Sequence, residues 1–308
     1  MKNILYISLL SIILFSCEDK IDISKKLSSG KVALVVDAFM NNLPEEQIIK
    51  LGTTQYYFDN SGPKGATGAT VKLIDLSNQI SYPFVEKEAG LYYSGLKGDS
   101  MLKLNHNFQL HISYNSETFV SYSQVNRIVL IDSIKFELAK QPTGEEVLGK
   151  YDAEFFATDA VGAGDRYFVR HYKNGQRSLK SSSIGIGYDA SAFPNGITDG
   201  IVFTLPLRRF FINENLMEDK WKDDDKLKVE LYSITEEASL FLSQVKTQST
   251  LGDGGPLSPL FSPPPANVPT NIINPDANGN KAVGFFCTSS VSYIQTTVPN
   301  KAFRNNPF

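Results

Sequence analysis

Histidine side chains are the first candidates for chemistry in this sequence, and there are three: His106, His111 and His171. His106 and His111 lack the i, i+2 spacing that would put both imidazoles on one face of a strand. A zinc site would therefore need carboxylates from distant segments. The sequence contains no Gly-x-Ser-x-Gly motif, phosphate loop or dinucleotide fingerprint. We predict no catalytic residues, no metal ligands and no cofactor, and we expect that the chain is not an enzyme.

Acidic residues form short runs that lack the spacing of a known site. Asp223-Asp224-Asp225 has neither the alternating ligands nor the glycine of a calcium loop, so we interpret it as a solvated turn. Neighbouring side chains in Glu145-Glu146 and Glu236-Glu237 point apart on a helix or a strand. A glycosidase would need two carboxylates brought together from distant strands, which the sequence leaves open.

Cys17 has the clearest chemical context of any residue. It follows Leu14-Phe15-Ser16, in which a bulky apolar residue is followed by two spacers, the second of them small. Lys2 and an apolar run at 4–15 precede it, in the three-part form of a secretion signal. The run is too short to span a bilayer, which takes about 20 residues. This pattern resembles a lipobox, whose cysteine thiol receives diacylglycerol before the chain is cut.

Lipidation fixes the expected location of the protein. We predict a lipoprotein signal peptide at 1–16, lipid attachment at Cys17 and a tether at 17–30. Acyl chains such as palmitate contribute about 0.8 kcal/mol per buried CH2, and more than one makes a stable membrane anchor. Glu18-Asp19 resembles the surface-export signals of Bacteroidota lipoproteins, so we expect the outer membrane and its outward face. The formal net charge of -3 argues against a nucleic-acid partner.

Composition predicts a mostly β protein. The chain of 308 residues is rich in Phe and Tyr, with many Gly, Asn and Ser residues in turn-like clusters. Cys287, the second cysteine, has no partner for an intramolecular disulfide once Cys17 carries lipid. It is either a nucleophile or a small buried side chain, and we favour the buried side chain.

The first predicted domain, at 31–126, is an immunoglobulin-like β-sandwich. Apolar or alternating segments separated by turn residues predict seven short strands, a number and spacing typical of that fold. They are 32–36, 48–56, 70–75, 80–85, 91–94, 107–114 and 118–123.

The second predicted domain, at 127–308, is β-rich with one packed α-helix. Its candidate strands are 134–139, 152–157, 166–172, 201–211 (interrupted by Pro206), 226–232 and a closing segment at 281–298 in which Gly284 allows a close approach. Asn174-Gly175 is typical of a hairpin turn. The segment 226–232 alternates strictly, which predicts one polar, half-exposed face.

The helix is predicted near 235–248. Ser233 and Glu236 have the spacing of a capping box. An apolar stripe follows at helical spacing, so the helix should lie against the sheet of the second domain. The stripe consists of Ala238, Phe241, Leu242 and Val245.

A proline-rich loop is predicted near 252–275. Proline fixes φ and removes a backbone donor, so this segment cannot be a central strand. Its stiff surface could face a partner protein, or the prolines could simply seal a sheet edge. The candidate partner-facing residues are Pro263, Pro264, Pro265 and Asn267.

Several motifs in order along the mature chain resemble one family, the Bacteroidota lipoproteins known as domain of unknown function 4249. They are Cys17-Glu18-Asp19, Phe58-Asp59-Asn60-Ser61 followed by Gly68-Ala69-Thr70-Val71, Gly90-Leu91-Tyr92, Val229-Glu230-Leu231-Tyr232-Ser233-Ile234, and Pro263 to Ile272 before Val283-Gly284-Phe285-Phe286. The segment 274–281 departs from the pattern because it is longer than the resemblance leads us to expect.

The resemblance implies an outer-membrane lipoprotein that accompanies a TonB-dependent nutrient transporter. It brings no catalytic residues with it. The expected function is a non-catalytic accessory that binds a ligand or docks on the transporter. The alternatives are a surface enzyme acting on glycan or peptide, and an adhesin or envelope scaffold.

Overall fold

The computed structural model describes residues 31–56, 59, 61–194, 196–213, 220–250 and 268–299. Within these ranges the chain is mainly β, as predicted. The strands are β1 (Leu34–Asn41), β2 (Glu46–Thr53), β3 (Lys64–Gly65), β4 (Thr70–Asp75), β5 (Ile80–Glu88), β6 (Leu91–Lys97), β7 (Asn107–Tyr114), β8 (Glu117–Gln124), β9 (Ile131–Lys140), β10 (Glu146–Ala157), β11 (Arg166–Lys173), β12 (Gln176–Arg177), β13 (Gly185–Tyr188), β14 (Trp221–Lys222), β15 (Lys226–Ile234) and β16 (Ala282–Thr297). The helices are α3 (Gly98–Met101), η1 (Ser181–Ser183), α4 (Leu207–Phe210) and α5 (Glu236–Thr250).

The N-terminal half is the predicted two-layer antiparallel sandwich. β1, β2 and β6 form one layer, and β4, β7 and β8 form the other. β5 joins the layers because its first residues pair with β4 and its last with β6. Alternate side chains such as Val36 and Ile49 point inward and meet Leu73 and Leu110 in one core. Each of the seven predicted segments overlaps a strand.

The C-terminal half has three layers. β9, β10 and β14 form a small sheet. It packs on β11 and β15 through a core that includes Phe155, Tyr167 and Leu231. Because strand residues alternate between faces, Tyr232 points to the opposite side, where α5 covers the sheet. The mainly β fold with one packed helix is therefore confirmed.

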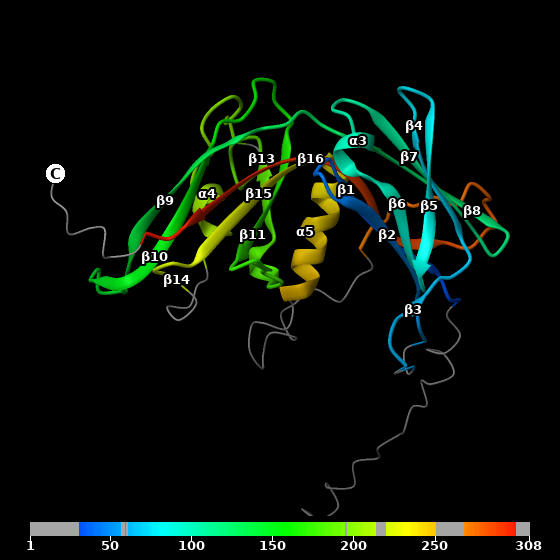
Figure 1. Cartoon of the computed structure of the whole chain (residues 1–308), viewed down its shortest axis with the longest axis horizontal. Coiled ribbons are helices and arrows are strands. Elements are labelled where there is room, and N and C mark those ends of the chain that lie inside the picture. Colours follow the sequence, from blue (N-terminus) through cyan, green and yellow to red (C-terminus); the bar gives the residue numbers. More distant parts are fainter. Residues whose placement is uncertain are drawn as a thin grey trace, which may run out of the picture.

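Strand β16 belongs to both halves. Its residues 282–289 pair in parallel with β1, and residues 290–297 pair antiparallel with β15. Figure 1 shows this strand crossing the molecule beside α5 and linking the two ends. Gly284 has a φ of +95°, and a Cβ there would overlap the carbonyl oxygen of Val36, which confirms the predicted close approach. The division at 126/127 stays a prediction, but part of the C-terminal segment completes the N-terminal sheet.

Helix α5 lies where the two halves meet. Its apolar stripe packs on Phe39 of β1 and Phe285 of β16 as well as on β11 and β15, so it covers more than the second half's sheet. The predicted capping box is wrong by two residues. Ser233 still belongs to strand β15, where it pairs with Ser290 of β16. The Thr235 hydroxyl caps the helix instead and accepts the Ala238 N–H at 3.3 Å.

Two strand predictions in the C-terminal half need correction. Residues 201–211 do not form a strand: Val202 makes a single bridge to Thr158, and α4 follows Pro206. Proline has no N–H for a strand partner, and Leu207 instead turns into the core. The polar face of β15 is exposed only at its start: Lys226 is exposed and Lys228 is partly buried, but Glu230 is buried among its hydrogen-bond partners. In the described residues, no helix has both the length and the apolar character to cross a membrane.

Candidate functional site

A groove of about 860 Å³ lies where the sandwich meets helix α5. Three walls form it: the ends of β7 and β8, the first turn of α5, and the segment 270–273. Its lining is rich in amides, hydroxyls and carboxylates and includes Ser77, Asn107, Tyr122, Gln124, Asn126, Glu236, Glu237, Thr270 and Asn271.

Hydrogen bonds between distant segments hold these walls in place. Val120 and Ile273 exchange two backbone hydrogen bonds of 2.8 Å each. The side chain of Asn271 bonds both the N–H and the carbonyl of Phe286, at 2.9 and 2.7 Å, so it takes the place of a strand neighbour. The Asn126 amide donates to the Ile234 carbonyl at 2.8 Å and ties β8 to the entrance of α5. The groove is thus built into the junction of the two halves.

The groove combines hydrogen-bonding groups with one exposed aromatic face. Tyr122 is 54% exposed, and its hydroxyl accepts a hydrogen bond from Gln109 at 2.9 Å, which fixes the ring. Glu236 and Glu237 lie in the first turn of α5, where the helix dipole favours negative charge. Such a surface suits a polar ligand that also has an apolar face.

The edge of β8 adds backbone groups to the groove. Val120 directs its N–H and carbonyl away from β7 toward Ile273. Because strand backbones alternate with a period of two, Tyr122 and Gln124 direct theirs the same way, and both line the groove. An extended peptide is therefore one ligand that this edge could bind.

His106 and Asp75 form a hydrogen-bonded pair beside the groove. The Asp75 carboxylate is fully buried and lies 2.8 Å from Nδ1 of His106. It also accepts the N–H groups of Ser77 and Asn78, so it closes the turn after β4. Since Asp75 engages Nδ1, proton transfer by His106 would use Nε2.

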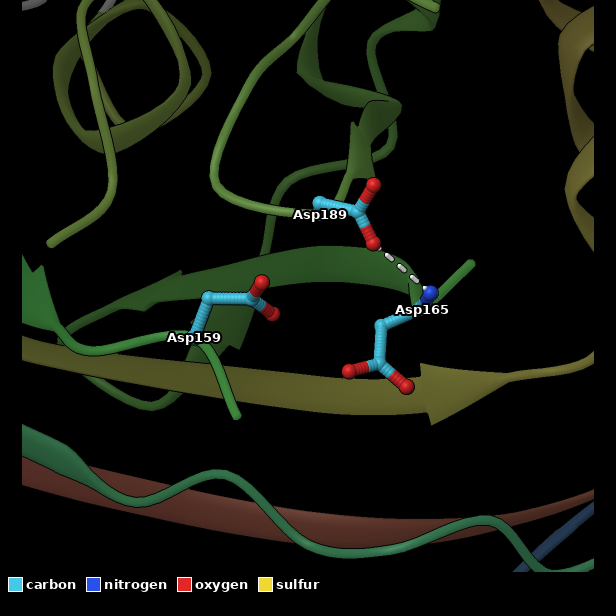
Figure 2. Close-up of side chains that lie close together, drawn as sticks. All are labelled: Asp159, Asp165 and Asp189. Atoms are coloured by element: carbon cyan, nitrogen blue, oxygen red, sulfur yellow. Dashed lines mark hydrogen bonds between the residues drawn. The ribbon is translucent and has the colours of Figure 1, made fainter. Parts of the chain in front are cut away.

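A second polar cluster, formed by Asp159, Asp165 and Asp189, lies at the loops that follow β10 and β13. Figure 2 shows the three carboxylates converging, and they place ligand atoms within 4.8 Å of one another. Carboxylate oxygens are the ligands that calcium prefers. Here Arg127 supplies the positive charge: its guanidinium bonds the Asp165 carboxylate and the carbonyls of Ala160 and Val161.

The hydrogen bonds of this cluster join two loops. Asp189 accepts the N–H of Asp165 and of Gly164, each at 2.8 Å. Asp159 accepts the Tyr167 hydroxyl at 2.5 Å and the Gly200 N–H at 3.1 Å. Burial raises the pKa of the Asp159 carboxyl, although both of these hydrogen bonds act to lower it. We interpret the cluster as a clamp that fixes the loops to Arg127.

The structure brings no predicted histidine site together. The three histidines lie apart: His106 directly precedes β7, His111 is on β7 and His171 is on β11. Among the described residues, the three aspartates are the one group with metal-ligand spacing. Cys287 is buried, as predicted, and burial raises its pKa to about 12.

The predicted solvated turn at 223–225 is a turn but is not fully solvated. Asp225 accepts hydrogen bonds from Lys222 and Asn174 and forms an ion pair with Lys173 at 3.1 Å, which closes the entry to β15. These bonds lower the pKa of Asp225 although its burial acts to raise it.

Five of the predicted site residues lie outside the described residues. They are Cys17, Pro263, Pro264, Pro265 and Asn267. Lipidation and the partner-facing loop therefore stay predictions.

Sequence reasoning missed both the groove and the aspartate clamp. Asp159, Asp165 and Asp189 have irregular spacing, and only the Gly-rich run at 162–164 between two of them signals an unusual turn. The groove depends on segment 270–273 returning to β8, which no local pattern encodes.

Comparisons with known proteins show the family but no activity. A crystal structure of bovine butyrophilin matches 66% of this chain and 92% of its own, with 9% identity and a TM-score of 0.18, too low to support an argument. No curated protein matches the chain. A family model described as a domain of unknown function (DUF4249) matches residues 19–295. That match covers most of the sequence, and the chain therefore belongs to the domain of unknown function 4249 family.

Proposed function

We propose that this protein is a lipid-anchored outer-membrane lipoprotein at the cell surface that serves as a non-catalytic accessory to a TonB-dependent nutrient transporter. The groove between the sandwich and α5 is the observation that carries the proposal. The Cys17 pattern supports the anchor and the compartment.

The groove favours a ligand-binding role because its polar groups are positioned before a ligand arrives. Asn126 and Asn271 already hold its walls through backbone carbonyls, so little side-chain ordering is left to oppose binding. Tyr122 offers a flat ring and the glutamates offer acceptors. A sugar or an extended peptide has matching chemistry, and the two glutamates favour a ligand without negative charge.

A pull-down from outer membranes in mild detergent tests the accessory role. The tagged full-length chain should bring one TonB-dependent transporter in near-equal amount, identified by mass spectrometry. The Cys17→Ala chain is the control, because it should leave the membrane and lose the partner. Recovery of the wild-type chain alone would contradict the proposal and favour an adhesin or envelope scaffold.

One observation favours a second candidate, a surface hydrolase. The buried carboxylate of Asp75 fixes the ring of His106, which directly precedes the groove residue Asn107, and Glu236 and Glu237 line the same groove. Glycan or peptide hydrolysis that is lost in His106→Ala but retained in His111→Ala would support this candidate. If the wild-type chain hydrolyses neither glycans nor peptides, the hydrolase candidate is excluded and the accessory role stays the proposal.

A further inference from the structure

Large apolar side chains are exposed on two neighbouring loops of the C-terminal half. The loops are residues 158–165 and 189–205, and we call them the loop tip. Val161 is 81% exposed, Phe193 is 62% exposed and Ile197 is fully exposed. Ile201, Val202 and Leu205 are exposed as well. Figure 1 shows the loops after β10 and β13 together at the upper edge of this half. Apolar groups gathered in this way on a soluble surface mark an interaction site.

The loop tip is held in one shape by the aspartate clamp. The N–H of Gly162 donates to Asp199 at 2.8 Å, and the N–H of Gly200 donates to Asp159 at 3.1 Å. The backbones of Asp159 and Ile201 are also bonded at 2.9 Å. The apolar side chains are thus presented on a fixed backbone, which lowers the entropy lost when a partner binds.

The charge of the loop tip decides between a membrane and a protein. The two loops contain four aspartates and no lysine or arginine; the aspartates are Asp159, Asp165, Asp189 and Asp199. Asp159 is buried, Asp165 and Asp189 are partly buried, and Asp199 is exposed. Arg127 neutralises Asp165, and Arg166 and Arg208 donate to the backbone carbonyls of Asp165 and Phe203. Surfaces that bind anionic lipid use lysine and arginine, which the two loops lack, and an anionic lipid surface would repel the exposed Asp199. A protein surface with an apolar patch and a basic rim is complementary to it.

We propose that the loop tip is a docking surface for a partner protein whose apolar patch is bordered by lysine and arginine. The proposal rests on the accessory function above and names the surface through which the accessory meets its partner. Ile197 and Phe193 lie in the contact, and the exposed Asp199 lies at its rim.

A photo-crosslinking side chain placed at Ile197 of the full-length, membrane-anchored chain tests the surface directly. Leu179 is the matched control because it is 84% exposed and follows β12, which pairs with the end of β11 that lies away from Asp165. The Ile197 probe should crosslink to the protein that co-purifies with the wild type, and the Leu179 probe should not. Equal crosslinking from both positions, or none from Ile197 while the partner still co-purifies, would overturn the proposal.

The double variant Phe193→Ser/Ile197→Ser tests the same surface without a crosslinking reaction. Both side chains are exposed, so its melting temperature should match that of Leu179→Ser. Co-purification of the partner should fall about tenfold or more in the double variant. In a separate experiment, added salt should weaken co-purification with the wild-type chain, because salt screens the attraction between opposite charges. Undiminished recovery with the double variant would refute the loop tip and leave the accessory function standing. Failure of the wild type to recover any partner would refute the accessory function itself.

Vesicles of phosphatidylglycerol and phosphatidylethanolamine, with and without millimolar calcium, separate lipid from protein. The soluble chain should not sediment with them. Binding that requires Ile197 would show that a membrane, rather than a protein, occupies the loop tip.

Discussion

Arg127 shows how one side chain can stand where a metal ion would otherwise be expected. Its guanidinium donates to the Asp165 carboxylate and to consecutive loop carbonyls, which are the same oxygen types that calcium would bind. The hydrogen bonds to Asp165 raise the pKa of Arg127, so its charge is permanent. The sequence around Asp159 and Asp165 does not reveal this, because Arg127 lies more than thirty residues away.

Arg127→Gln should destabilise the folded state. It also removes the positive charge beside the three carboxylates, so a bound cation should stabilise this variant. The Asp165 carboxylate and the loop carbonyls would lose their donors, at a cost of about 1–3 kcal/mol. Urea unfolding measures the loss, with Lys50→Gln as the control because the Lys50–Asp37 pair is exposed. Millimolar calcium should raise the melting temperature of Arg127→Gln and leave the wild type unchanged. Equal stabilisation of both chains would mean that calcium binds beside Arg127.

His111 should make stability depend on pH. Burial lowers its pKa below the ordinary 6.5, and Lys72 on the neighbouring strand lowers it further. The unfolded chain therefore takes up a proton at this position before the folded chain does. Stability is complete above pH 6.5 and falls as the pH drops below it, by at most about 1.4 kcal/mol per pH unit. His111→Gln should flatten this part of the stability curve between pH 7 and 5, and an unchanged slope would assign it to other groups.

At the scale of single elements, periodicity predicts that a helix or strand exists better than it predicts where the element begins and ends. The stripe from Ala238 to Val245 predicts α5, and alternation predicts β7, because both patterns are local. The capping-box pattern predicts a cap at Ser233, but pairing with the distant Ser290 holds that residue in β15. Pro206 predicts an interruption within a strand, whereas in the structure helix α4 follows it and Leu207 is buried in the core.

Gly284→Ala tests the closest contact between elements. A methyl group would overlap the Val36 carbonyl, and the φ of +95° is strained for any residue with a Cβ. Gly144→Ala is the matched control because Gly144 has a φ of +89° and open space around it. The control should lose about 1–2 kcal/mol of unfolding free energy, and Gly284→Ala should lose about 1–3 kcal/mol more. Equal losses in urea unfolding would show that β1 and β16 can separate without cost.

At the scale of the whole molecule, topology was the part that the sequence could not supply. The seven predicted strands of the N-terminal half suggest a self-contained sandwich at 31–126. In the structure, Ile272, Ala282 and Phe286 complete its core, and β16 covers the open edge of β1. The pairing of β1 with β16 joins residues more than 200 positions apart, and no periodic pattern encodes it.

A fragment limited to 31–126 should therefore be unfolded in isolation. Without β16, strand β1 exposes its backbone on one side, and the shared core loses Phe286. Fusing residues 268–289 to this fragment through a flexible linker should restore a cooperative urea transition. A fusion in which Phe286 is replaced by Ser controls for the added length and should stay unfolded. If 31–126 alone unfolds cooperatively with the stability of the fusion, then β16 is an addition to a complete sandwich. If only the fusion folds, the sandwich can form only after the C-terminal segment is made, and the groove that segment 270–273 borders forms with it.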